Sequence, residues 1–167
     1  MTAVVSRRHE RYDQDSTRKE IIKISKKMEA ALNAQINAEY YSSYLYLAMS
    51  ASLEGETLSG MAHWMRLQSG EELEHVKKFY AYIVERGGRV TLDAIEAPPA
   101  KWKSAKTIFE EGYKHEQKVT ALIHKLVDLA VAEKDYATQN FLQYFVKEQV
   151  EEEANALAIV EKFNMVG

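Results

Sequence analysis

The chain has 167 residues, of which 46% are hydrophobic and 28% are charged, and its formal net charge is -3 at pH 7. This length fits one domain with a sizeable core, and the small negative charge gives no reason to expect nucleic acid or an anionic membrane as a partner. The absence of cysteine excludes disulfides, iron–sulfur clusters and thiolate zinc sites.

The N-terminal segment, residues 1–24, is predicted to be a mobile extension, because its first twenty or so residues mix both charge signs with almost no large aliphatic residues. Within it, Thr17-x-x-Glu20 could cap an early helical turn. The segment lacks the apolar region of a secretory signal, and no apolar run in the chain reaches the roughly 18 residues of a membrane span. We therefore expect a soluble, cytoplasmic protein.

Residues 25–167 are predicted to form a single helical domain. The sequence favours four long helices, which run from about Ser25 to Leu53, Thr57 to Arg86, Ser104 to Glu133 and Asp135 to Phe163. The pair Gly87-Gly88 is a helix stop signal, and Pro98-Pro99 forbids a helix in the segment that follows it. Short, long and short connections indicate an all-α antiparallel four-helix bundle with one long crossover between the second and third helices.

Each predicted helix carries a stripe, spaced alternately by three and four residues, that should face the bundle axis. Near the middle of its stripe every helix has one glutamate, namely Glu39, Glu72, Glu116 and Glu152. No lysine or arginine lies on these stripes. Four unpaired buried carboxylates would each cost several kcal/mol or bind protons. Bound cations would remove this conflict, and His75 adds an imidazole ligand on the same face.

The two halves of the chain share a loose spacing. Glu39 precedes Glu72 by 33 residues, and Glu116 precedes Glu152 by 36 residues. Two helix pairs would thus form a pseudo-symmetric pocket for two ions, and oxygen ligands with one nitrogen suit iron or manganese. The first half adds a histidine three residues after its second glutamate, whereas the second half has Asn155 there. We therefore expect the second ion to be held more weakly, as suits iron that must leave after oxidation.

At these residues the chain closely resembles the non-haem ferritins of bacteria and archaea. The resemblance covers roughly residues 25–167 and rests on six segments in order, ALNAQINAEYYSSYLYLAM, EELEH, ERGGRV, PPAKW, YKHE and FLQYFVKEQVEEE. It implies a ferritin-like bundle that acts as a ferroxidase, oxidising Fe(II) to Fe(III) with dioxygen or peroxide at a di-iron centre in each subunit. It also implies that the mineral is stored inside a shell of subunits.

Carried over by position, the resemblance assigns a role to each candidate site residue. The first iron would be held by Glu39, Glu72 and His75. The second iron, bridged to the first by Glu72, would be held by Glu116 and Glu152 with Gln149 beside it.

The resemblance also implies a third iron and an electron donor. Residues Glu71, Glu148 and Glu151 match those that, with Glu152, hold a third iron on the inner-surface side in many prokaryotic ferritins. Tyr46 matches a tyrosine thought to donate an electron to the site, although it could also be a core tyrosine with a satisfied hydroxyl.

The chain departs from the family in a segment that bears on assembly. The chain ends at EKFNMVG, where relatives continue through a short fifth helix that lines the fourfold axis of the shell. We expect a homo-oligomer of 24 subunits with wider or looser fourfold openings. The alternative is a ferritin-like di-iron protein that oxidises iron without forming a closed storage shell.

Three rival readings fit the residues less well. Bacterioferritin has Glu-x-x-His in both halves and a haem-binding methionine after its bridging glutamate, but here Asn155 and Leu73 stand in those places, so no haem is expected. Rubrerythrin would need cysteine pairs. A storage subunit without ferroxidase activity would need a broken ligand set.

The histidines off the stripes, His63, His115 and His124, are interpreted as surface residues.

Overall fold

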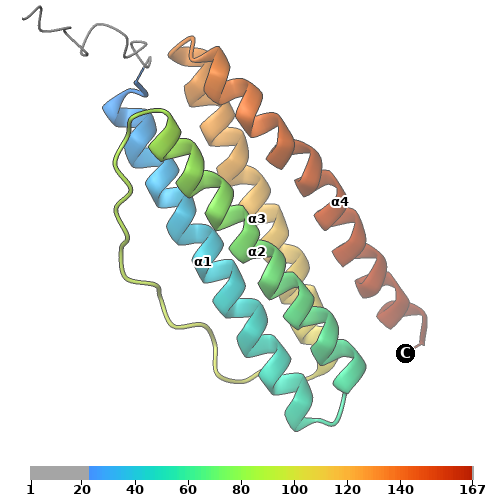
Figure 1. The fold of residues 1–167 in the computed structure, drawn as a ribbon. Helices are drawn as coiled ribbons and strands as arrows, with labels where there is room; N and C mark the ends of the chain where they lie inside the picture. Colours follow the sequence, from blue (N-terminus) through green and yellow to red (C-terminus); the bar gives the residue numbers. More distant parts are fainter. Residues whose placement is uncertain (1–22, 167) are drawn as a thin grey trace, which may run out of the picture.

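The structure, a computed structural model, describes residues 23–166, and these form four helices joined in an antiparallel bundle (Figure 1). The helices are α1 (Lys26–Gly55), α2 (Ser59–Glu85), α3 (Ala105–Ala132) and α4 (Tyr136–Val166). The predicted all-α bundle is confirmed, and no strand occurs between residues 23 and 166. Among the described residues, no helix is both long and apolar enough to cross a membrane.

The predicted extension, with its Thr17–Glu20 cap, lies outside the described residues except at its last two positions. At the second of these, Ile24 is buried in the core and its N–H donates to the Arg86 carbonyl oxygen at 3.3 Å. The packed part of the chain therefore includes Ile24, which the sequence analysis placed in the extension.

Local signals set the helix starts. The Ser25 hydroxyl accepts a hydrogen bond from the Met28 N–H at 2.9 Å, and the Ser104 hydroxyl accepts one from the Thr107 N–H at 3.2 Å. Both serines are N-caps, and they lie where the sequence predicts that these two helices start. Asp135 has the same role for α4, because its carboxylate accepts from the Thr138 N–H at 3.1 Å.

Three helices end in a left-handed residue that reverses the chain. At the end of α2, Gly87 has a φ of 66°, and the Gly88 N–H donates to the Ile83 carbonyl oxygen at 2.8 Å. Thr57 and Lys134 hold the same position after α1 and α3, with φ values of 60° and 56°. The prediction that α2 begins near Thr57 is therefore two residues early, since a residue with this φ cannot be in the helix.

The crossover, residues 86–104, runs along the outside of α1 from one end of the bundle to the other (Figure 1). Two asparagines of α1 hold it in place. The Asn33 amide donates to the Arg89 carbonyl oxygen at 2.9 Å and accepts from the Thr91 N–H at 2.8 Å. Asn37 donates to the carbonyl oxygen of Ala94 at 3.1 Å. These contacts explain how a segment without regular structure is fixed on the bundle.

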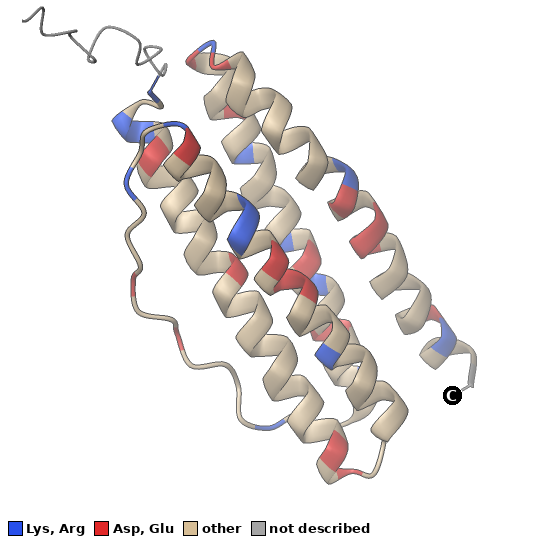
Figure 2. Cartoon of the chain, in the orientation of Figure 1, with Lys and Arg blue, Asp and Glu red and all other residues tan. Residues whose placement is uncertain are grey.

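The core consists of two apolar clusters, one toward each end of the bundle. One cluster contains Phe79 and Phe145, whose rings stack with centroids 4.2 Å apart, and the other contains Met49, Met65 and Phe109. On each of the first three helices, the residues of one cluster precede a buried glutamate and the residues of the other cluster follow it. These glutamates are Glu39, Glu72 and Glu116, as the stripes predict. Acidic residues accordingly gather around the middle of the bundle (Figure 2).

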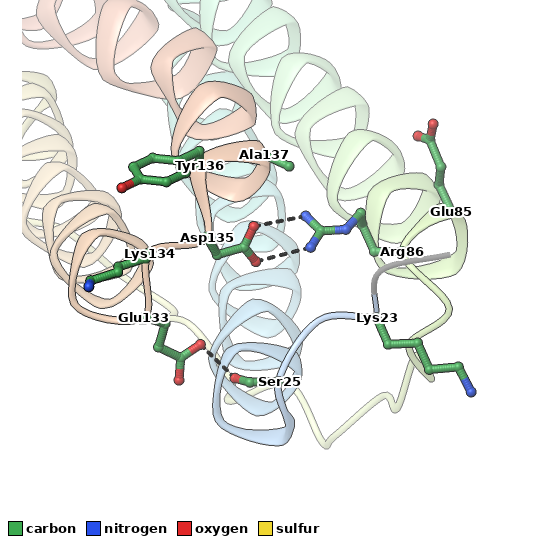
Figure 3. A pocket seen from close by; sticks show the side chains of 9 residues that line it. All are labelled: Lys23, Ser25, Glu85, Arg86, Glu133, Lys134, Asp135, Tyr136 and Ala137. Atoms are coloured by element: carbon green, nitrogen blue, oxygen red, sulfur yellow. Dashed lines mark hydrogen bonds and ion pairs between the residues drawn. The ribbon is translucent and has the colours of Figure 1, made fainter. Parts of the chain in front are cut away.

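One end of the bundle has an open pocket of about 1030 Å³ (Figure 3). None of the predicted metal ligands lines this pocket. Here the Arg86 guanidinium donates to both carboxylate oxygens of Asp135, each at 3.2 Å. The Ser25 hydroxyl donates to Glu133 at 2.6 Å. These contacts join the chain before α1 and the end of α2 to the α3–α4 turn, so they hold the bundle together at this end.

Candidate metal centre

Three of the predicted ligands meet in the core between α1 and α2. Glu39, Glu72 and His75 each offer a ligand atom, and these atoms all lie within 4.8 Å of one another. The His75 Nδ1 lies 3.2 Å from Glu72 Oε2 and 4.0 Å from Glu39 Oε2. Each of the three residues is at most 5% exposed. The structure therefore brings together the three residues that the sequence assigns to a first metal position.

The spacing in the sequence explains this placement. Glu72 and His75 are three residues apart, so they lie on one face of α2. The His75 ring packs edge-on against Phe145, with centroids 5.5 Å apart, which limits its rotation. On α1, the Gln35 amide donates to Glu39 Oε1 at 2.8 Å from one turn earlier.

One carboxylate oxygen of this group has no partner. Glu39 Oε2 is buried and makes no hydrogen bond with any of the described residues. A buried acceptor left without a partner costs about 1–3 kcal/mol, and more when it is charged. A cation bound by Glu39, Glu72 and His75 would satisfy this oxygen, and the donor set of two carboxylates and one imidazole suits iron. The residues present thus fit a metal ion.

Electrostatics support the same conclusion. Burial, and then the charge of Glu72, raises the pKa of Glu39 well above its ordinary value. Burial, and then the charge of Glu116, likewise raises the pKa of Glu72, with further contributions from Glu152 and Glu71. Without a cation, burial and mutual repulsion favour the protonated form of these carboxyl groups. A bound cation would displace those protons, because it favours the ionised carboxylates.

Glu116 is buried on α3 and is held by two hydrogen bonds. The Tyr46 hydroxyl donates to Glu116 Oε1, and the Gln149 amide donates to Glu116 Oε2 at 3.2 Å. Burial raises the pKa of Glu116, while these two hydrogen bonds lower it. Burial and the charge of Glu116 raise the pKa of Tyr46 well above its ordinary value, so its phenol stays protonated.

Glu152 is half-buried on α4, and Gln68 connects it to α2. The Gln68 amide donates to Glu152 Oε2 at 3.1 Å and to Glu71 Oε2 at 3.0 Å. Burial, and then the charge of Glu116, raises the pKa of Glu152 to about 7. The charge of Glu152 in turn contributes to the raised pKa of Glu72.

The residues predicted for a third iron share a pocket of about 340 Å³ between α2 and α4. Glu71, Glu148, Glu151 and Glu152 line it, and His75 lies in the same wall. The pocket is therefore acidic and adjoins the Glu39–Glu72–His75 group.

The ligands predicted for the second metal position are not brought together in the same way. Glu116 and Glu152 lie outside the close group of Glu39, Glu72 and His75 among the described residues. Their oxygens accept hydrogen bonds from Tyr46, Gln149 and Gln68 instead. A second cation would have to replace some of these hydrogen bonds.

Several polar residues around the Glu39–Glu72–His75 group were not predicted from the sequence, and one histidine was predicted in the wrong environment. Gln35 could have been found from its position four residues before Glu39, which is helical contact distance. His115 is half-buried rather than on the surface, and its Nε2 lies 2.7 Å from the Ser42 hydroxyl. Burial lowers the pKa of His115 to about 4, so the prediction of a surface residue is wrong.

Fold and site together define a four-helix-bundle protein with a buried centre of carboxylates and histidine. Comparison with known families agrees, since the family model described as a ferritin-like domain matches residues 29–166. The chain belongs to the ferritin family.

Individual relatives support this assignment over most of the chain. The chain is 49% identical over 144 residues to a bacterial non-heme ferritin of Bacteroides fragilis, which covers 86% of this chain and 91% of that protein. It is 40% identical to the bacterial non-heme ferritin of Campylobacter jejuni, over 86% of each chain.

Among solved structures, an open pore ferritin from the hyperthermophilic archaeon Archaeoglobus fulgidus superposes with a TM-score of 0.86 and 54% identity, over 87% of this chain and 90% of that one. An engineered closed form of the Archaeoglobus fulgidus ferritin has the same TM-score and identity, and covers 87% of this chain and 88% of that one.

Proposed function

We propose that this protein is an iron-storage ferritin and that each subunit is a ferroxidase. Iron is the substrate and cargo: two Fe(II) ions give up two electrons, which together with two protons convert one dioxygen to one hydrogen peroxide, or convert one hydrogen peroxide to two waters. The observation that carries the proposal is the buried Glu39–Glu72–His75 group with the unpartnered Glu39 Oε2. The family membership and the names of the relatives support it.

The proposal gives each predicted ligand a role. Glu39 and His75 bind the first iron, and Glu72 bridges the two ions. Glu116 and Glu152 bind the second iron, with the carbonyl oxygen of Gln149 as a neutral ligand. Fe(III) is favoured over Fe(II) by a site rich in carboxylates, because hard anionic oxygens stabilise the higher charge. This preference drives the oxidation.

Two further elements complete the proposed reaction. Glu71, Glu148 and Glu151, with Glu152, hold a third iron in the acidic pocket and pass iron from the centre toward the mineral. We place Tyr46 as an electron donor, because its hydroxyl contacts Glu116 directly and its proton can move to that carboxylate as the electron leaves. When the third position is also occupied, three Fe(II) and Tyr46 supply the four electrons that, with four protons, reduce one dioxygen to two waters.

The experiment is an anaerobic Fe(II) titration of the apo-protein, followed by exposure to oxygen. We expect about two to three Fe(II) per subunit and rapid oxidation on aeration. Glu72→Ala should reduce the fast phase most, since it removes the bridge between both ions. Glu85→Ala, at an exposed glutamate of the same helix, is the matched control. A Glu72→Ala variant that oxidises iron as fast as the parent would show that this pocket is not the ferroxidase centre.

A triple variant separates the third position from the other two. Replacing Glu71, Glu148 and Glu151 together by alanine should spare the initial oxidation of two irons and change the stoichiometry and later turnover. If this variant and Glu72→Ala lose the fast phase equally, the positions are one functional unit and the distinction fails.

We also propose that the subunits form a closed shell of 24 that stores the Fe(III) mineral, with wider openings than in most relatives. The open pore described for the Archaeoglobus fulgidus ferritin supports such openings, because that chain is 54% identical to this one.

A further inference from the structure

A short chain of hydrogen bonds leads from Glu116 to a glutamate that has no part in the proposed iron sites. Gln149 Nε2 donates to Glu116 Oε2 at 3.2 Å and to Thr120 Oγ1 at 3.2 Å. The Thr120 hydroxyl then donates to Glu153 Oε1 at 2.5 Å. Glu153 is half-buried on α4 and Thr120 is half-buried on α3, so the chain crosses between these two helices.

The direction of these bonds fixes the orientation of the Gln149 amide. A threonine hydroxyl has one proton, and here Thr120 donates it to a carboxylate that has none to give back. Thr120 can therefore only accept from Gln149, which forces the NH₂ end of the amide toward it. The carbonyl oxygen of Gln149 is at the other end of the amide and remains free for another partner.

A cation bound by the Glu116 carboxylate would remove one of the acceptors that hold this orientation, leaving the longer contact to the Glu116 backbone carbonyl oxygen and the contact to Thr120 Oγ1. In the structure, the Glu116 carboxylate and its backbone carbonyl oxygen both accept from Gln149 Nε2, the latter at 3.3 Å. When a cation takes over the carboxylate, that hydrogen bond weakens. If the Thr120 proton were then free, it could turn to the carbonyl oxygen of a flipped Gln149. Glu153 prevents this by holding the proton.

We propose that Glu153 is a positioning residue for the second metal position, acting through Thr120 to hold the carbonyl oxygen of Gln149 ready for a cation. This rests on the proposed function, in which Glu116, Glu152 and Gln149 bind the second iron. Groups that orient metal ligands in this way typically change metal affinity about 10–100-fold when removed.

Glu153 could instead act only through its negative charge, and two substitutions at Thr120 distinguish the mechanisms. Thr120→Val keeps the shape and leaves Glu153 in place but removes the hydroxyl. Thr120→Ser keeps the hydroxyl. Positioning predicts that only the valine variant is impaired, whereas an effect of charge alone predicts that both behave like the parent.

The test is an anaerobic Co(II) titration of the full-length apo-protein, followed by calorimetry and by the visible absorption of bound Co(II). We expect Glu153→Ala and Thr120→Val to weaken the second Co(II) about tenfold or more and to leave the first unchanged. Thr120→Ser should bind both ions like the parent. Glu161→Ala, at an exposed glutamate of the same helix, is the control.

The outcomes separate this inference from the proposed function. If Thr120→Val binds the second Co(II) as tightly as the parent, or if Thr120→Ser is impaired equally, Glu153 is not a positioning residue. If the parent itself binds fewer than two Co(II), or if Glu72→Ala keeps both, the proposed centre is wrong and Glu153 has no second position to support.

Discussion

The Tyr46 hydroxyl on α1 donates a hydrogen bond to Glu116 on α3, and both residues are buried. The contact joins α1 to α3 near the buried glutamates in the middle of the bundle. On its other side, the Tyr46 ring contacts the edge of His115, with centroids 6.0 Å apart and an interplanar angle of 85°. Because His115 is itself held by Ser42, the phenol has a fixed position and a single partner for its proton.

Tyr46→Phe should affect stability and iron oxidation separately. The Glu116 carboxylate loses one of its two donors, so we expect the free energy of unfolding of the apo-protein to fall by about 1–2 kcal/mol in urea. Fe(II) binding should keep its stoichiometry, while oxidation in rapid-mixing experiments slows. Tyr80→Phe, at an exposed tyrosine, is the control. Unchanged oxidation together with lost stability would leave Tyr46 only a structural role.

The stability of the apo-protein should fall as pH rises from about 6.5 to 8. Burial raises the pKa of Glu152 to about 7, and it raises the pKa of Glu39 and Glu72 well above their ordinary value, so the folded state binds more protons than the unfolded state as Glu152 titrates. The contribution of such groups to the free energy of unfolding is fully present below their ordinary pKa of 4.5, and it is lost as pH rises through the pKa of the folded state. Urea unfolding at each pH, without metal, measures the effect.

Saturating Co(II) is the counterpart of this pH experiment. The metal binds the ionised carboxylates, so the fall in stability with pH should disappear or reverse. His115 opposes this fall, because its folded pKa is lowered to about 4 while its ordinary value is 6.5, but the opposing rise in stability fades as pH passes 6.5 and is nearly complete a unit higher. A metal-free protein whose stability is constant or rises between pH 6.5 and 8 would contradict the raised pKa values.

Gly88→Ala should destabilise the end of α2. A methyl group there would lie 2.8 Å from Ile24 Cδ1 and 3.0 Å from Ile83 Cγ2, both in the packed core. Relief of such contacts typically costs about 1–3 kcal/mol. Gly60→Ala is the matched control, since nothing lies within 4 Å of the added methyl group and alanine favours a helix. Urea unfolding should show a loss for Gly88→Ala and no loss for Gly60→Ala, and equal behaviour would refute the close packing.

The sequence predicts those features that depend on helical periodicity. A period of 3.6 residues fixes which side chains share a face, so Glu39, Glu72, His75 and Glu116 could be placed in the core from their spacing alone. The serine N-caps and Gly87 are equally local signals, and the structure confirms them.

Contacts between helices could not be predicted in the same way. The Thr120–Glu153 hydrogen bond joins residues 33 positions apart, and it depends on how far α3 and α4 are displaced along their axes. The periodicity of each helix gives no information on the displacement between two helices. The left-handed conformation of Thr57 was missed for a different reason, because a β-branched residue rarely adopts it and only the tight α1–α2 turn imposes it.

Assembly into the proposed shell should depend on apolar side chains that the subunit leaves uncovered. Several aromatic residues of α1 and α2 lie off the stripes that face the bundle axis. Among them, Tyr40, Tyr41 and Trp64 are half-buried against the core, but Tyr44 and Tyr80 are 49% and 52% exposed. Further exposed apolar residues are Leu47, Val84, Leu92 and Ile95. Where such side chains form a contiguous patch, as neighbours three or four residues apart on one helix can, they typically mark an interface between subunits.

Leu47→Glu tests this surface, since a buried charge without a partner should prevent two subunits from packing there. We expect the parent to sediment as a particle of about 24 subunits, and the variant to sediment as smaller species at low salt, with its helical circular dichroism unchanged. Gln117→Glu, at an exposed polar position of α3, adds the same single negative charge and is the control. Both variants and the parent are compared at several salt concentrations, with and without iron, because cargo and screening each strengthen a weak shell. If the parent sediments only as dimers under all these conditions, the shell does not form, and the chain oxidises iron without storing it in a closed particle.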